Sequence, residues 1–276
     1  MAAEDDLIAA ITAVLPAAAP GLVDVGIGDD AAVLPGGLLL AADMLVDGVH
    51  FDASIRTAEW IGARAAAANL SDIAAMGGEP ICLTASLGIP DGFPDVAGLA
   101  RGIGRHGVPL AGGDLSRAPV LVVSLAVLGR AERPLLRSTA RAGDRLAVTG
   151  PLGAQAAGGY AADVEPRLAE GRRLAGVATA MIDLSDGIAT DAARLAAASG
   201  LRARVYLERL PLAPGAGIEQ AATGGEDFEL LAALPPDVPV PAGLTEVGTL
   251  LQGEGIELLD GSGRPVDLTG WDHFRR

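Results

Sequence analysis

The chain has 276 residues, of which half are hydrophobic and very few are aromatic, and its formal net charge is −15. This length favours two domains over one, with cores built from Ala, Leu, Val and Ile. The negative charge excludes a nucleic-acid partner, whose phosphates need a basic surface. All twenty basic residues are Arg, which also excludes lysine Schiff-base chemistry and the lysine of a phosphate-binding P-loop.

The first half of the chain alternates between helical and extended patterns. Thr57 is a suitable N-cap for an Ala-rich helix that Gly77-Gly78 would end. The continuous apolar run at residues 120–128 predicts a strand that is buried on both faces. The other expected elements of this half are a helix at residues 5–15, strands and a turn within 31–51, a strand at 81–89, a helix at 95–107 and a strand at 108–111.

The composition becomes polar and Arg-rich around residues 137–143, where we place a domain boundary that gives domains 1–137 and 138–276. The second half mixes strands and helices without strict βαβ regularity, so two α+β or α/β halves are expected. Its expected helices lie at residues 153–162, at 167–179 and after Asp186, and its expected strands at 145–148, 202–207, 228–234, 244–247 and 255–259.

Cys82 and the chain's N-terminus bear on where the protein works. The cysteine lies in an apolar run, which indicates a buried thiol and not a nucleophile. The acidic N-terminus is unlike a signal peptide, and the longest apolar stretch, residues 119–128, is too short to cross a bilayer. We therefore expect a cytoplasmic protein with no membrane partner.

Five short stretches place carboxylates among small residues, where a metal or a phosphate could approach closely. Hard cations such as Mg²⁺ prefer oxygen ligands and commonly bind carboxylates together with substrate phosphates. Carboxylates from distant parts of one chain therefore predict a site where metals neutralise phosphate. The five stretches are Gly26-Ile27-Gly28-Asp29-Asp30, Asn69-Leu70-Ser71-Asp72, Gly112-Gly113-Asp114, Ile182-Asp183-Leu184-Ser185-Asp186-Gly187 and Gly224-Gly225-Glu226-Asp227.

Several of these stretches also have a plainer explanation. Asp72 could face water from a helix, and Gly112-Gly113-Asp114 after a strand could be either a ligand-binding turn or a simple β-turn. Ser185 or Asp186 could be only the N-cap of a helix, although capping leaves Asp183 unexplained. Residues 102–107 match a Gly-x-Gly-x-x-Gly pattern, but they close a helix, so a dinucleotide site is not expected.

Taken together, these segments resemble the thiamine-monophosphate kinase family, which belongs to the aminoimidazole-ribonucleotide-synthetase-like ATP-binding superfamily. The resemblance is carried by their order and spacing along nearly the whole chain. Further matching segments are Asp43-Met44-Leu45-Val46-Asp47-Gly48-Val49-His50-Phe51, Val148-Thr149-Gly150 and Gly270-Trp271-Asp272-His273-Phe274.

The resemblance implies a two-domain fold, an ATP-dependent reaction and roles for individual residues. The N-terminal domain would bind ATP and Mg²⁺ and pair with a second copy into a β-barrel, and the C-terminal domain would complete the active site. The reaction would phosphorylate thiamine monophosphate to thiamine diphosphate by direct in-line transfer, without a general base, in a homodimer. The implied contacts are Asp30, Asp43, Asp72, Asp114, Asp183 and Asp186 for several Mg²⁺ ions, Gly113, Arg137 and Ser185 for ATP, and His50, Glu226 and Trp271 for thiamine monophosphate.

Two segments depart from the family pattern. Ala41 and Ala42 stand where Ser or Thr is common, and residues 158–166 form a short version of their segment. Two alternatives stay open: another ATP-dependent enzyme of the superfamily, and a non-catalytic binder of nucleotide or thiamine phosphate. The position of Cys82 disfavours superfamily members that need a cysteine near one terminus, and the many carboxylates disfavour a pure binder.

Overall fold

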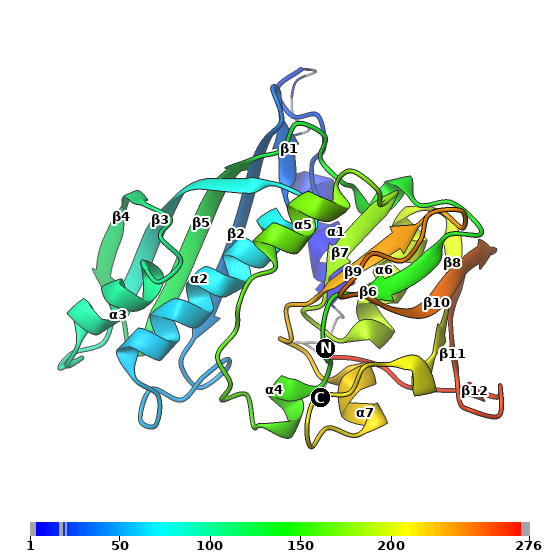
Figure 1. Ribbon diagram of the computed structural model, residues 1–276. Helices are drawn as coiled ribbons and strands as arrows, with labels where there is room; N and C mark the ends of the chain where they lie inside the picture. The colour runs from blue at the N-terminus through cyan, green and yellow to red at the C-terminus, as the bar shows by residue number, and fades with distance from the viewer. Residues whose placement is uncertain (1–3, 17–18, 20, 272–276) are drawn as a thin grey trace.

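Two β-sheets organise the computed structural model, which describes residues 4–16, 19 and 21–271 (Figure 1). The N-terminal sheet has the strand order β1-β2-β5-β3-β4, and the C-terminal sheet has the order β12-β11-β8-β10-β6-β9-β7. The chain passes from the first sheet to the second between β5 and β6. Each sheet is combined with helices, so the chain has the expected α+β organisation in two halves.

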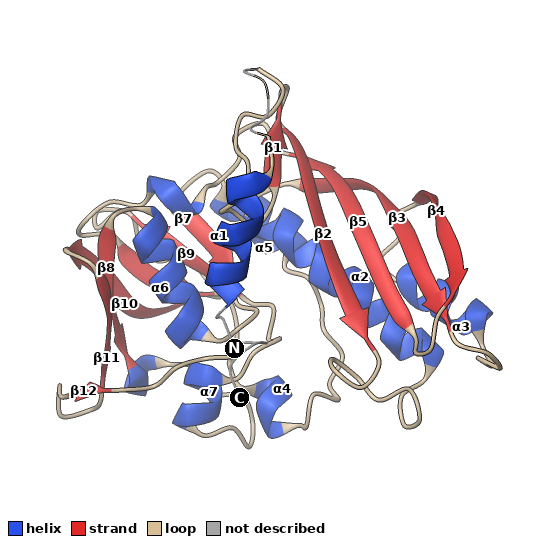
Figure 2. Ribbon diagram, turned by 180° about the vertical axis from the view of Figure 1, so that it is seen from behind, coloured by secondary structure: helices blue, strands red, loops and turns tan. Residues whose placement is uncertain are grey.

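Helices α2 and α3 pack together beside the N-terminal sheet, and no described helix covers its opposite face, which we call the open face (Figure 2). The helices of this half are α1 (Glu4–Val14), α2 (Ala58–Ala75) and α3 (Val96–Ile103). Its strands are β1 (Ala32–Leu34), β2 (Leu38–Val46), β3 (Glu79–Ile89), β4 (Leu110–Arg117) and β5 (Val122–Arg130).

Helix α2 is the central helix of the molecule, as its Ala-rich sequence predicts. Thr57 caps it by accepting a hydrogen bond from the backbone N–H of Trp60 at 3.2 Å. Its small side chains allow close packing against β5, β2, β7, α3 and α5. A Cβ atom on Gly102 would lie only 2.1 Å from the Glu59 carbonyl oxygen, so this glycine of the Gly-x-Gly-x-x-Gly pattern serves helix packing.

The expectation that β5 is buried on both faces was wrong. Only alternate residues, Val123, Leu125 and Val127, are fully buried on the helix side. Leu40 on the neighbouring β2 is paired with Leu128 and is 44% exposed, because it lies on the open face of the sheet. Side chains on successive strand positions point to opposite faces, and helices cover one face of this sheet.

The C-terminal half contains two elements near the site that the sequence patterns did not predict. Strand β7 (Ala180–Asp183) lies at one edge of the sheet, and α7 (Ile218–Thr223) precedes the Gly224-Gly225 segment. The remaining elements are η1 (Arg137–Thr139), β6 (Arg145–Val148), α4 (Ala154–Ala157), α5 (Leu168–Leu174), α6 (Ile188–Ala198), β8 (Leu201–Tyr206), η2 (Leu207–Arg209), β9 (Leu230–Leu234), β10 (Thr245–Gln252), β11 (Gly255–Leu259) and β12 (Pro265–Val266).

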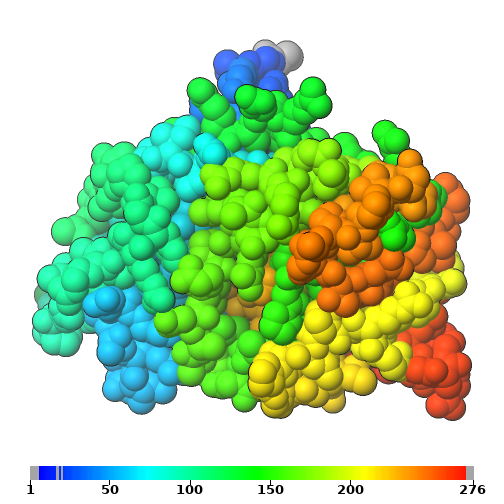
Figure 3. Space-filling view, viewed as in Figure 1, coloured from blue at the N-terminus to red at the C-terminus, as the bar shows by residue number. Residues whose placement is uncertain are grey.

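Helix α5 joins the two halves on the face seen in Figure 3, where its green residues fill the space between them. Gly171 of α5 approaches α2 so closely that a Cβ atom would lie 2.1 Å from the Ala74 carbonyl oxygen. The two sheets are therefore held against a common central helix. None of the described helices has the length and hydropathy needed to span a bilayer.

Candidate active site

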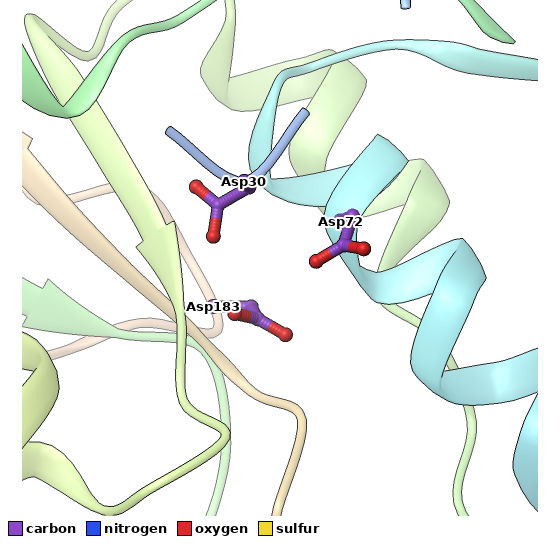
Figure 4. Close-up of side chains that lie close together, drawn as sticks. All are labelled: Asp30, Asp72 and Asp183. Carbon is purple, nitrogen blue, oxygen red and sulfur yellow. The ribbon is translucent and has the colours of Figure 1, made fainter. Parts of the chain in front are cut away.

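Three aspartates from three separate elements converge where α2 meets the two sheets (Figure 4). Asp30 precedes β1, Asp72 lies in the last turns of α2, and Asp183 ends β7. One carboxylate oxygen of each lies within 4.8 Å of the others. Asp30 and Asp183 are buried, with 9% and 4% of their surface exposed. Residues more than 100 positions apart thus form one carboxylate cluster.

Hydrogen bonds hold the carboxylate cluster in place. The Ser71 hydroxyl donates to Asp183 Oδ2 at 2.7 Å. Arg137 donates from Nη2 to Asp30 Oδ1 at 2.6 Å and from its backbone N–H to Asp29 Oδ2 at 3.1 Å. Arg137 neutralises part of the negative charge, but its single positive charge is smaller than the combined charge of the carboxylates around it.

Burial raises the pKa of Asp72 and of Asp183 well above the usual range. Repulsion from Asp43 and Asp183 raises the pKa of Asp72 further, and repulsion from Asp30 does the same for Asp183. Burial and the neighbouring Asp30 raise the pKa of Asp29 to about 6. The cluster therefore holds more negative charge than its protein partners stabilise, because charged groups lose hydration when they are buried.

This excess of buried negative oxygen fits a divalent cation such as Mg²⁺, which binds carboxylates readily. Asp43 adjoins the cluster, since its β2 position places it on the helix side of the sheet, where it lies within hydrogen-bonding reach of Asp72. The amide of Asn69 orients this strand by accepting from the Asp43 backbone N–H at 3.2 Å. Burial raises the pKa of Asp43 as well.

A cavity of about 1080 Å³ opens beside the carboxylate cluster and is lined by both halves of the chain. A volume of this size can hold a ligand as large as a nucleotide. Ala42, one of the departures from the family pattern, also lines it. Ten of the twelve residues that the resemblance implied line this cavity: Asp30, Asp43, His50, Asp72, Arg137, Asp183, Ser185, Asp186, Glu226 and Trp271.

The other two, Gly113 and Asp114, lie elsewhere in this chain. They do not follow a strand, as predicted, but lie within β4, an edge strand whose residues are all exposed. Strand register puts Asp114 next to Ser86, and Ser86 next to Ser124. Ser124 is next to the exposed Met44, so all four side chains lie on the open face of the sheet. Asp114 is therefore on the opposite face from the carboxylate cluster.

The backbone of β3 accounts for Gly113 without any ligand. A Cβ atom at this position would lie 1.9 Å from the carbonyl oxygen of Ala85, which no side chain can tolerate. Strand pairing alone therefore requires glycine here.

A second acidic group near the cavity was not predicted as a unit. Helix α6 begins after Gly187, so neither Ser185 nor Asp186 is its N-cap. Instead, the buried Asp191 accepts from the Asp186 backbone N–H at 3.0 Å, and Arg194 pairs with both carboxylates. Burial and the adjacent Asp186 raise the pKa of Asp191 to about 7. The available signal was the spacing of Asp191 and Arg194 along α6, shortly after Asp186.

The expected substrate residues lie along another wall of the cavity. Glu226 has a left-handed backbone with φ of +64° and forms an ion pair with Arg64. The Nδ1 atom of His50 accepts from the Val46 backbone N–H at 3.0 Å. The Trp271 backbone N–H donates to the Asp186 carbonyl oxygen at 3.0 Å, and 53% of this residue is exposed. Asp272, His273 and Phe274 lie outside the described residues.

A left-handed conformation costs a non-glycine residue on the order of 1 kcal/mol, and such residues often lie at functional sites. The loop that carries Glu226 is fixed by the partly buried carboxylate of Asp227, which accepts hydrogen bonds from the backbone N–H groups of Gly153 and Gln155. The strain is thus held by neighbouring contacts, and the Glu226 side chain is kept at the cavity.

Comparisons with known proteins agree with this arrangement. Residues 28–131 match the family model described as AIR synthase related protein, N-terminal domain. A thiamine-monophosphate kinase of Halobacterium salinarum is 38% identical over 89% of this chain and 94% of its own length.

Solved structures give the same result. The structure described as AaThiL complexed with AMPPCP and TMP has a TM-score of 0.86 and 31% identity, over 99% of this chain and 97% of that one. Thiamine monophosphate kinase from Aquifex aeolicus has a TM-score of 0.79 and 28% identity, over 96% of each chain. These similarities establish that the chain belongs to the thiamine-monophosphate kinase family.

Proposed function

We propose that this protein is an enzyme that transfers the γ-phosphoryl group of ATP to thiamine monophosphate, giving thiamine diphosphate and ADP. The observation that carries the proposal is the buried carboxylate cluster of Asp30, Asp72 and Asp183 at the wall of a large cavity. The related AaThiL structure is a complex with AMPPCP, an ATP analogue, and with TMP. A relative that binds these two phosphorylated ligands supports the same pair of ligands for this chain.

The proposed metal ligands are the aspartates that the sequence singled out. Asp30, Asp43, Asp72 and Asp183 would hold Mg²⁺ at the cluster, and Asp186 would do so beside it. Bound Mg²⁺ would supply positive charge to phosphate oxygens that otherwise repel one another. That repulsion is about 4 kcal/mol for two unit charges 4 Å apart at an effective dielectric constant of 20.

The chain's own residues would bind and orient the two substrates. Arg137 and Ser185 would contact ATP, and His50, Glu226 and Trp271 would contact thiamine monophosphate, all from the walls of the same cavity. The acceptor is already an oxyanion near neutral pH, so no residue needs to remove a proton from it. Orientation and charge neutralisation are then sufficient for direct in-line transfer without a phosphorylated protein intermediate.

We also propose that the protein is a homodimer that pairs its N-terminal domains, residues 1–137, through the open face of the sheet. Exposed apolar residues such as Leu40 and Met44 on that face support this arrangement. Asp114 lies on the same face, and Gly113 lies beside it on the same edge strand. Both would therefore act at the dimer interface, where Asp114 would be a further metal ligand and Gly113 would contact ATP. Residues 138–276 form the second domain. ATP is a cytoplasmic metabolite, and we place the activity there.

The first experiment measures thiamine diphosphate formed from thiamine monophosphate and ATP, with Mg²⁺ and with EDTA. We expect metal-dependent product and one ADP for each product molecule. Binding of thiamine monophosphate without turnover would support a non-catalytic binder instead. Failure to bind thiamine monophosphate would point to a different substrate, as for another ATP-dependent enzyme of the same superfamily.

A further inference from the structure

Arg64 is a buried arginine of α2 that reaches the wall of the cavity. Only 3% of its side chain is exposed, yet it pairs with the Glu226 carboxylate. It also donates from Nη1 to Gln155 Oε1 at 3.3 Å and to the Ala162 carbonyl oxygen at 3.4 Å. All three acceptors belong to the C-terminal half. One guanidinium from the central helix therefore ties three separate segments together.

The neighbours of Arg64 restrict its guanidinium to one position. Trp60 lies one helical turn earlier, so the two side chains meet on the same face of α2, and the guanidinium lies 5.1 Å from the centre of the indole ring. The indole is itself fixed, because its Nε1 donates to the Ala161 carbonyl oxygen at 3.2 Å. Arg56 covers the same ring at 5.0 Å. The arginine is thus in place before any ligand binds.

Glu226 depends on this arginine for its position. Its backbone N–H donates a hydrogen bond to the Ser185 carbonyl oxygen at 2.7 Å, and its side-chain Oε2 accepts a hydrogen bond from Arg64 Nη2. A quarter of the Glu226 side chain is exposed, and the residue lines the cavity. Arg64 therefore aims the carboxylate while part of it remains accessible to a ligand.

We propose that Arg64 is a positioning residue that sets the affinity for thiamine monophosphate by fixing the Glu226 carboxylate; this inference rests on the proposed function. The thiamine moiety carries a positive thiazolium ring and an amino group, both complementary to an oriented carboxylate. A planar guanidinium fixes a carboxylate better than a flexible ammonium does. The hydrogen-bond partners of Arg64 among the described residues are Glu226, Gln155 and Ala162, which all lie outside the carboxylate cluster, so we assign it to substrate binding and not to the transfer step.

The test compares steady-state kinetics of Arg64→Met and Arg64→Lys with the unmodified protein. For Arg64→Met we expect the KM for thiamine monophosphate to rise by roughly tenfold to hundredfold, which is the value of a hydrogen bond to a charged group. The KM for ATP and kcat should stay within about twofold. Arg64→Lys keeps the charge without the planar fork, so it should fold and show a smaller rise.

Two comparisons separate positioning from a general structural role. Arg101→Met removes an exposed arginine of α3 that pairs with Glu59 of α2, and it should leave every kinetic constant unchanged. Adding Glu226→Gln to Arg64→Met should raise the KM little further, because the two residues act as one unit.

An unchanged KM for thiamine monophosphate in both Arg64 variants would overturn the inference. So would equal changes in both KM values, or a loss confined to kcat. If the unmodified protein fails to phosphorylate thiamine monophosphate, the proposed function itself is overturned. The two failures are therefore distinct.

Discussion

Ser71 on α2 donates its hydroxyl hydrogen to the Asp183 carboxylate on β7 at 2.7 Å, and both residues are buried. The bond joins the central helix to the C-terminal sheet inside the candidate site. It favours the ionised form of Asp183 and opposes the effect of burial on its pKa. The Ser71 hydroxyl can therefore orient the Asp183 carboxylate for a metal.

Ser71→Ala should weaken Mg²⁺ binding by about tenfold, because Asp183 loses a hydrogen bond to its charged form. Titration calorimetry with Mg²⁺ and an ATP analogue measures this directly. Ser262→Ala, which removes a hydroxyl hydrogen bond to Asp260 away from the residues that line the cavity, serves as the matched control and should bind Mg²⁺ normally. Equal affinities for the two variants would contradict the role assigned to Ser71.

Asp183→Asn should lower kcat/KM by at least about hundredfold while raising the free energy of unfolding of the metal-free protein. The substitution removes one of several buried negative charges, and its amide oxygen can still accept from Ser71. Urea unfolding in EDTA and product formation with Mg²⁺ give the two values. The exposed Asp237→Asn should change neither. A fully active Asp183→Asn protein would disprove the metal assignment.

The metal-free protein should lose stability as the pH rises from about 4 towards 7. The pKa of Asp29 is raised from 3.8 to about 6, and that of Asp191 from 3.8 to about 7. The folded state therefore binds more protons than the unfolded state in this range, so the free energy of unfolding falls with rising pH. The total change is on the order of a few kcal/mol.

Urea unfolding in EDTA at about pH 5 and about pH 8 measures this dependence. Asp191→Asn should reduce the pH dependence, because it removes the group with the higher of these two pKa values. Saturating Mg²⁺ should reduce it too, since bound cations favour ionised carboxylates. A free energy of unfolding that rises with pH in EDTA would contradict the prediction.

Leu40→Asp should convert the proposed dimer into a monomer and reduce activity at low protein concentration. Leu40 is 44% exposed on the open face of the sheet, and a charge there would be buried by a second copy. Light scattering after size-exclusion chromatography measures the mass. Val266→Asp, on the exposed β12, should leave the mass unchanged. A monomeric, fully active unmodified protein would argue against the dimer and against a role for Asp114.

The sequence by itself predicted the central helix and most of the residues that meet at the cavity. The signal for α2 was strong because Thr57, the Ala-rich run and Gly77-Gly78 all agree with one helix. Asp30, Asp72 and Asp183 could be selected because each lies among small residues in a family-specific order. Their proximity was implied by resemblance, since no local pattern reports distances between segments so far apart.

Only the tertiary structure decided which face each side chain occupies and which partners it meets. Strand β4 extends through Gly112-Gly113-Asp114, and strand register then places Asp114 on the open face, away from Asp72. Because the strand continues past its predicted end, Asp114 lies in the sheet and not in a loop, and the strand register determines which face of the sheet its side chain occupies. The sequence patterns did not single out Arg64, because its partners Gln155 and Glu226 lie 91 and 162 residues further along the chain. Such pairings depend on how the two halves pack against α2, which no periodicity encodes.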